Sequence, residues 1–185
     1  MTKFSVRLGI VPKIITVACF IIMSFALIKL TQVLLAGGFN IVYLSLIILL
    51  LISIVSPVFT MPVSIYALDD RLLLKKLLGS KTIFYSDIIV AERFYTKSDI
   101  RIFGSGGYWG FFGIFSNPRI GRYTAFVGDY KEAVLIQVAI AGGYKSYVVS
   151  CRNYDEFIML VNNNRDIRTI LSATTATANN YQNGN

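Results

Sequence analysis

Two long apolar runs without a charged residue stand almost back to back near the start of this chain. They cover Ile14 to Ile28 and Ile41 to Phe59. The second run is nineteen residues long, close to the roughly 20 apolar residues that a helix needs to cross the hydrocarbon core of a bilayer. The first run reaches a similar length if it continues through Lys29 to Leu35. The sequence therefore predicts a transmembrane hairpin, with helices over residues 14–35 and 41–61 and a turn over residues 36–40.

Lys29 is the single charged residue inside the predicted spans. A lysine near the end of a span can lay its stem along the helix and hold its ammonium group among the lipid headgroups. A functional role, in which Lys29 pairs with a ligand or a proton path, is the alternative. Neither span contains an Asp or Glu that could partner it, so we interpret Lys29 as a snorkelling residue.

Basic residues flank both outer ends of the hairpin, whereas the turn between the spans carries no charge. The flanking residues are Lys3, Arg7 and Lys13 in the N-terminal segment (residues 1–13) and Arg71, Lys75 and Lys76 after the second span. The positive-inside bias predicts that both ends of the chain lie in the cytoplasm. A cleaved signal peptide ending near Ala36 is the alternative, but the apolar stretch is long for one and a second full span follows at once.

The net charge of +8 and the two cysteines narrow the class of protein. The positive charge is spread along the chain, and basic residues beside a bilayer are favoured by an anionic inner leaflet. We therefore do not expect a nucleic-acid partner. Cys19 lies in the first span and Cys151 in the later domain, so the sequence predicts no disulfide framework.

After the hairpin, the hydrophobic pattern changes to short runs of two-residue period separated by turn residues. Asn153 and Glu156 then have the spacing of a helix N-terminus before Phe157, Leu160 and Val161. The strand-like runs are residues 63–68, 72–78, 88–95, 123–127, 134–140 and 145–149. The pattern predicts a mainly β domain, a small antiparallel barrel or sandwich capped by one C-terminal helix.

Three segments carry a resemblance to a known family. They are Phe84-Tyr85-Ser86-Asp87-Ile88, the glycine and aromatic run from Gly104 to Gly113, and Tyr147-Val148-Val149-Ser150 leading into Asp155-Glu156-Phe157. In this order, and beside a helical hairpin, they resemble the membrane-anchored bacterial pleckstrin-homology (PH) domain family. The resemblance covers Ser64 to Asn164, and the predicted PH-like domain spans residues 62–164. It implies a non-enzymatic interaction or scaffold domain at the bacterial inner membrane, and phosphoinositide binding is not carried over.

The run from Gly104 to Gly113 is the most unusual segment of this domain. No Gly-Lys-Ser or Gly-Lys-Thr follows it, so it does not have the pattern of a phosphate-binding loop. Its large rings have two possible uses: they fold onto the barrel as a core lid, or they stay outside and contact a protein partner or the bilayer interface. The candidate interaction residues are Tyr108, Trp109, Phe111, Phe112 and Phe115.

Basic residues bracket the same run and are candidate contacts for lipid headgroups. They are Arg93, Lys97, Arg101, Arg119 and Arg122. A solvated strand face is the favoured account of these charges, and contact with anionic lipid headgroups is the alternative. Beyond residue 164 the chain becomes rich in Ala, Thr and Asn, and we expect residues 165–185 to form a disordered polar tail.

The residues that most often carry catalysis or bind metals are missing from the sequence. The chain contains no histidine, which removes the commonest general base and metal ligand. The adjacent acidic residues, such as Asp69 with Asp70, fall in predicted turns or at a helix start, where carboxylates serve capping and solvation. We therefore expect no enzyme activity, cofactor or metal. The predicted function is binding of an unknown protein or of a second copy, with sensing of anionic lipid as the alternative.

Overall fold

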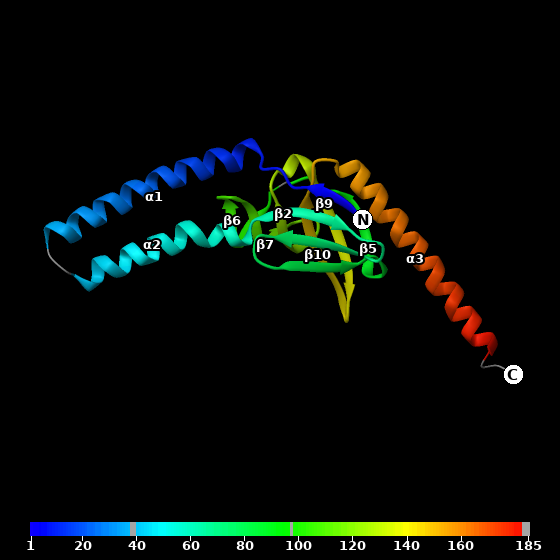
Figure 1. Cartoon of the computed structure of the whole chain (residues 1–185). Coiled ribbons are helices and arrows are strands. Elements are labelled where there is room, and N and C mark those ends of the chain that lie inside the picture. The colour runs from blue at the N-terminus through cyan, green and yellow to red at the C-terminus, as the bar shows by residue number, and fades with distance from the viewer. Residues whose placement is uncertain (38–39, 97, 183–185) are drawn as a thin grey trace.

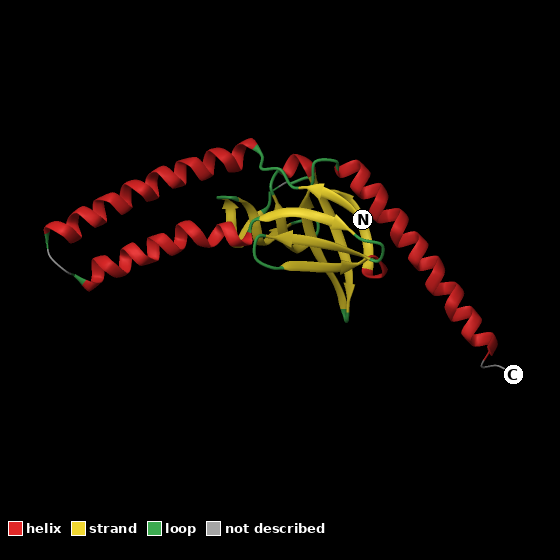
Figure 2. Cartoon of the chain, viewed as in Figure 1, coloured by secondary structure: helices red, strands yellow, loops and turns green. Residues whose placement is uncertain are grey.

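A computed structural model of the chain describes residues 1–37, 40–96 and 98–182. The described residues form a helical hairpin, two β-sheets and a long C-terminal helix (Figure 1). The hairpin extends to one side of the sheets and the C-terminal helix extends to the other, so the β domain lies between them (Figure 2). The predicted fold class, two apolar helices followed by a mainly β domain with a C-terminal helix, is confirmed.

The first strand of the domain precedes the hairpin. Strand β1 (Thr2–Ser5) pairs antiparallel with β2 (Pro62–Ala67), so that Thr2 faces Ala67 and Ser5 faces Ser64. Phe4 is 4% exposed. Between these paired strands the chain runs out along the hairpin and back. Because the two strands are neighbours in one sheet, both outer ends of the hairpin lie on the same side. The sequence predicts only a flanking segment over residues 1–13, and this strand is missed.

The hairpin consists of α1 (Ile10–Ala36) and α2 (Ile41–Thr60). Both helices are long and apolar enough to cross a membrane. Helix α1 begins at Ile10, four residues before the predicted start at residue 14. Pro12 is compatible with this start, because it lies in the first turn, where a missing N–H costs no helical hydrogen bond. Asn40 caps α2 by accepting a hydrogen bond from the Val42 N–H at 2.9 Å. Residues 38 and 39 of the predicted turn lie outside the described residues.

The two sheets contain four and six strands. The first has the order β1-β2-β3-β4, with β3 at Arg71–Lys76 and β4 at Ser80–Phe84. The second has the order β5-β9-β10-β8-β7-β6. Its strands are β5 (Ile88–Arg93), β6 (Ile100–Gly107), β7 (Gly110–Asn117), β8 (Gly121–Val127), β9 (Ala133–Ile140) and β10 (Gly143–Ser150). Strands β8 and β10 pair parallel, and the other described pairs are antiparallel.

Each face of the six-stranded sheet has its own apolar core. The larger core joins both sheets to the C-terminal helix and includes Leu72, Ile136 and Phe157, all 0% exposed. The smaller core covers the opposite face around Tyr123. Strands β5 and β6 are the two edges of the sheet, so the segment that joins them must cross one of its faces. Phe94 in this segment packs in the smaller core, and its ring centroid lies 5.4 Å from that of Tyr123.

The C-terminal helix α3 (Tyr154–Gln182) is longer than predicted. The sequence predicts a disordered tail from residue 165, whereas α3 continues to Gln182; residues 183–185 lie outside the described residues. Two arginines hold the helix against the domain. Arg165 Nη1 donates to the Ile89 carbonyl at 3.0 Å, and Arg168 Nη2 donates to the Asp69 carbonyl at 3.1 Å. Farther along α3, the backbone hydrogen bonds are made within the helix itself, so the helix needs no partner to satisfy its backbone groups.

The burial of Phe4 leads to a prediction about the N-terminal strand. The Phe4 ring packs edge-on against Phe157, with centroids 5.2 Å apart. Replacing a buried phenylalanine by alanine removes apolar contacts and leaves a cavity, so Phe4→Ala should lower the free energy of unfolding by about 3 kcal/mol. Denaturant unfolding of the full chain in detergent measures this. The neighbouring exposed Ser5→Ala is the matched control, and an equal effect of both changes would contradict the burial of Phe4.

Candidate interaction site

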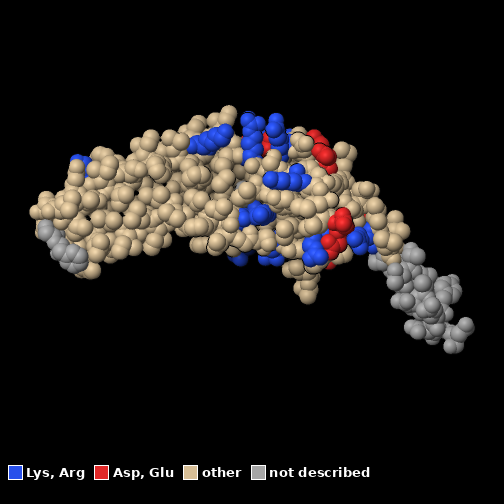
Figure 3. Space-filling model, in the orientation of Figure 1, with Lys and Arg blue, Asp and Glu red and all other residues tan. Residues whose placement is uncertain are grey.

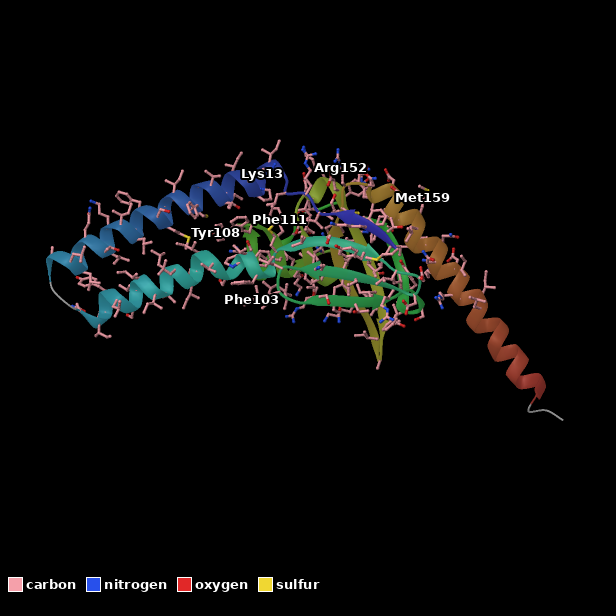
Figure 4. All side chains as sticks on the ribbon, in the orientation of Figure 1. Lys13, Phe103, Tyr108, Phe111, Arg152 and Met159 are labelled. Carbon is pink, nitrogen blue, oxygen red and sulfur yellow. The ribbon has the colours of Figure 1, made fainter. Side chains whose placement is uncertain are left out.

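The turn between β6 and β7 docks onto both helices of the hairpin. We call residues 107–110 the β6–β7 tip. The Tyr108 hydroxyl donates to the Ile54 carbonyl of α2 at 3.2 Å, and the Trp109 N–H donates to the Thr16 hydroxyl of α1 at 2.9 Å. Tyr108 lies where the two helices approach the domain (Figure 4). The tip therefore connects the β domain to each helix by a separate hydrogen bond.

Glycines make this close approach possible. Gly107 has φ +134°, and a Cβ placed on it would lie 2.6 Å from Ile15 Cδ1 of α1. Gly104 and Gly113 face each other in the β6–β7 register, with φ +112° and +116°. A Cβ on either one would lie about 2 Å from the opposite carbonyl oxygen. Only glycine fits such positions, so these residues allow the two strands to approach each other and the tip to reach the helices.

A small pocket of about 370 Å³ lies beside the tip, between the hairpin and β6. Its main lining residues are Ile15, Cys19, Pro57, Arg101, Tyr108 and Phe112. Arg101 lies over Gly106, where an added Cβ would be 3.0 Å from the guanidinium nitrogen Nη1. The pocket is thus mainly apolar, with one cation on the β6 side.

The five aromatic residues singled out in the sequence do not form one surface. Phe115 is 4% exposed and belongs to the smaller core, so it cannot contribute to a docking surface. Phe111 packs against Tyr130, with ring centroids 4.7 Å apart, at the margin of the same core. Tyr108 and Trp109 contact the hairpin, and the half-buried Phe112 lines the pocket beside it. The run is therefore divided between the core and the helix junction.

An exposed apolar surface is found instead on the neighbouring residues of β6 and β7. Phe103 and Ile114 are cross-strand partners and are 74% and 42% exposed. A groove of about 300 Å³ begins at Ile114 and continues over β8 and the β9–β10 turn. Its lining includes Ile114, Arg122, Thr124, Ile140, Tyr144 and Lys145, and we call it the β7–β10 groove. It combines an apolar floor with two cations.

The candidate headgroup residues are also separated from one another. The Arg93 guanidinium lies 4.3 Å from the centre of the Tyr154 ring, and Arg119 forms a 3.1 Å ion pair with Glu92. Arg101 lines the pocket beside the hairpin and Arg122 lines the β7–β10 groove. Lys97 lies outside the described residues. The structure thus brings none of the other four into a shared cluster.

A hydrogen-bonded group of polar residues closes the smaller core. Asp99 accepts hydrogen bonds from the Asn117 amide and from the Tyr123 hydroxyl, the latter at 2.9 Å. The Tyr123 and Tyr130 hydroxyls are 3.2 Å apart, so Tyr130 donates to Tyr123. Burial raises the pKa of Tyr130 to about 12 and raises the pKa of Tyr123 as well. Both phenols therefore stay protonated as donors, which is a structural role.

Metal-ligating side chains and the buried Cys151 thiol are the remaining groups that could carry chemistry. Among the described residues, no cluster of three or more His, Cys, Asp or Glu side chains could hold a metal ion. Cys151 is 0% exposed, and its burial, with Glu132 and Glu156 nearby, raises the pKa of its thiol to about 12. A thiol in that state is a poor nucleophile. Cys151 is therefore a packing residue.

Two exposed surfaces of the domain are not predicted from the sequence. The β7–β10 groove collects residues from distant strands, so no local pattern reveals it. The β3–β4 turn could have been found: Leu77 and Leu78 are followed by Gly79, and the structure places both leucines in the turn, 56% and 70% exposed. The hydrophobic pattern predicts that this strand ends at Leu78, whereas β3 ends at Lys76.

The docking of the tip can be measured through Trp109, since the chain contains a single tryptophan. In Gly107→Val, the added side chain meets Ile15, so the tip should leave α1 and the Trp109 emission should shift to longer wavelength. Gly121→Val is the matched control, because Gly121 also has positive φ, +70°, but has no neighbour within 4 Å. An unchanged emission spectrum in Gly107→Val would contradict the docking.

Comparison with known proteins identifies the domain. Residues 64–164 match the model of a family described as a bacterial PH domain. No curated protein and no solved structure matches the chain. The matched segment covers more than half of the 185 residues, and the two apolar helices before it fit the hairpin expected from the resemblance. The chain belongs to the bacterial PH domain family.

Proposed function

We propose that this protein is a membrane-anchored, non-enzymatic binding module. In this account α1 and α2 span the bacterial inner membrane, both ends of the chain lie in the cytoplasm, and the PH domain is held at the inner leaflet. There it binds a protein partner through the β7–β10 groove. The observation that carries the proposal is the combination of a strongly apolar, exposed hairpin with an exposed apolar and cationic groove on the β domain that follows it.

The exposure of the hairpin supports membrane insertion. None of the residues in the most apolar window of either helix is buried within the protein. The hairpin surface is almost free of charge, whereas Lys and Arg gather over the domain and the adjoining end of the hairpin (Figure 3). Such a large uncharged surface is unfavourable in water and is favoured in hydrocarbon.

The pairing of β1 with β2 supports a retained N-terminus. Cleavage near Ala36, as in a signal peptide, would remove β1 and the buried Phe4 from the domain. The same pairing places the basic residues of both flanks on one side of the hairpin, so the positive-inside bias acts on the two flanks in the same direction. Lys29 lies near the far end of α1, where its Nζ is 5.6 Å from the Phe25 ring centre.

The composition of the β7–β10 groove supports a protein partner of defined chemistry. Ile114 and Ile140 are exposed apolar side chains, and Arg122 and Lys145 lie beside them. A complementary segment would carry apolar residues for the floor and Asp or Glu for the two cations, because opposite charges give specificity at such rims. We therefore propose an acidic, partly apolar protein segment as the occupant.

A photo-crosslinking amino acid in place of Tyr144 tests the groove in membranes that contain the full chain. Tyr95 provides a matched control position, because the two tyrosines are 57% and 65% exposed. We expect a protein adduct from position 144 and none from position 95. Reversing both groove charges, Arg122→Glu with Lys145→Glu, should reduce the adduct about tenfold, which corresponds to about 1.4 kcal/mol of binding free energy.

Lys131→Glu with Arg152→Glu makes the same change in net charge outside the groove and should leave the adduct unchanged. Equal adducts from both positions, or equal losses in both double variants, would contradict the proposal. An adduct of twice the mass of the chain would assign the groove to a second copy.

A further inference from the structure

The β3–β4 turn has an unusual composition for its place in the fold. The Lys76 N–H donates to the Gly79 carbonyl at 3.1 Å, and Lys75 faces Ser80 in the register. Leu77 and Leu78 are therefore the two central residues of a tight turn, positions that usually carry Gly, Asn, Asp or Pro. They are 56% and 70% exposed. Two adjacent exposed leucines are unfavourable in water and favourable in an apolar medium.

The topology places this turn at the end of the sheet from which the hairpin leaves. In an antiparallel sheet of order β1-β2-β3-β4, the first and third connections lie at the same end. The first connection here is the hairpin and the third is the turn. A direct contact agrees with this, because the Leu78 N–H donates to the Phe59 carbonyl at 3.1 Å. Phe59 is the last residue of the apolar segment of α2.

Positive charge surrounds the turn. Lys75 and Lys76 precede it and Lys81 follows it, and no acidic residue occurs between Asp70 and Asp87. A pocket of about 420 Å³ lies beside the turn, with Lys75, Lys76, Leu77 and Tyr66 among its lining residues. The Lys3 and Lys75 ammonium groups lie 5.8 and 5.9 Å from the centre of the Tyr66 ring, one from each neighbouring strand of β2.

We propose that the β3–β4 turn is a second membrane contact, in which Leu77 and Leu78 enter the acyl region of the inner leaflet. Lys75, Lys76 and Lys81 then meet the phosphate groups of anionic phospholipids. Interfacial segments bind in this way, by combining buried apolar side chains with cations at headgroup level. The inference rests on the proposed insertion of α1 and α2, because Phe59 sets the depth of the turn. Together with the β6–β7 tip, the turn would fix the orientation of the domain on the bilayer.

The test uses the full chain in vesicles of phosphatidylglycerol and phosphatidylcholine, with Cys19→Ala so that labels attach only to introduced cysteines. Cys151 is fully buried and stays in place. A fluorophore is attached at Leu78→Cys, at Ala141→Cys in the exposed β9–β10 turn, or at Leu46→Cys within α2. We expect lipids that carry a quencher near the headgroup to quench the label at 78 severalfold more than the label at 141. Iodide in the buffer should instead quench the label at 141 more than the label at 78.

The contribution of the lysines to membrane contact is tested by a separate comparison. Lys75→Gln with Lys76→Gln should reduce lipid quenching at position 78, as should about 1 M salt, at which the Debye length is about 3 Å. Vesicles of phosphatidylcholine alone should give the same reduction. Equal iodide quenching at 78 and 141, with position 46 quenched by deep lipid quenchers, would overturn the inference while leaving the hairpin inserted. Failure of deep quenching at position 46 would instead overturn the insertion on which both proposals depend.

Discussion

The pairing of β1 with β2 is the interaction on which the rest of the structure depends. It makes the hairpin an insertion between two neighbouring strands of one sheet, so the domain is attached at both ends of the insertion. A domain that follows a membrane anchor through a single linker can rotate freely. Here the two connections are short: four residues separate β1 from α1, and Met61 alone separates α2 from β2. The position of the sheet is therefore coupled to the position of the helices.

Further contacts strengthen this coupling at different levels along α2. The Leu78 N–H binds the Phe59 carbonyl, and the Tyr108 hydroxyl binds the Ile54 carbonyl. These carbonyls are five positions apart in the helix, a rise of about 7.5 Å at 1.5 Å per residue. One turn from each sheet therefore contacts the same helix, and the β6–β7 tip reaches farther along it. The residues that line the β7–β10 groove belong to β7, β8, β9 and β10, not to the β6–β7 tip or the β3–β4 turn.

Local patterns predicted those parts of the protein that depend on local chemistry. The apolar runs predicted the hairpin, and Asn153 with Glu156 marked the start of α3. The two-residue periodicity predicted β2, β3, β5, β8, β9 and β10, but it did not predict β4, β6 and β7. Strand β1 was missed because four residues carry too little periodicity, and its partner is about sixty residues away in sequence. The aromatic run was recognised as unusual, but its rings divide between the core and the helices according to strand register, which composition does not encode. Where α3 passes residue 164, Arg165 and Arg168 donate to carbonyls of the domain, a tertiary contact that local sequence does not reveal.

Disulfide formation between β1 and β2 is the most direct test that these two strands pair across the hairpin. Lys3 and Tyr66 face each other in the β1–β2 register, so a chain with Lys3→Cys, Tyr66→Cys and Cys19→Ala should form an intramolecular disulfide on mild oxidation in membranes. Chemical cleavage at Met23, Met61 and Met159, followed by mass spectrometry, should then show the N-terminal fragment linked to the fragment of residues 62–159. A shifted pair, Lys3→Cys with Leu68→Cys, should link far less. Equal linkage of both pairs, or linkage only between chains, would show that β1 does not close the sheet across the hairpin.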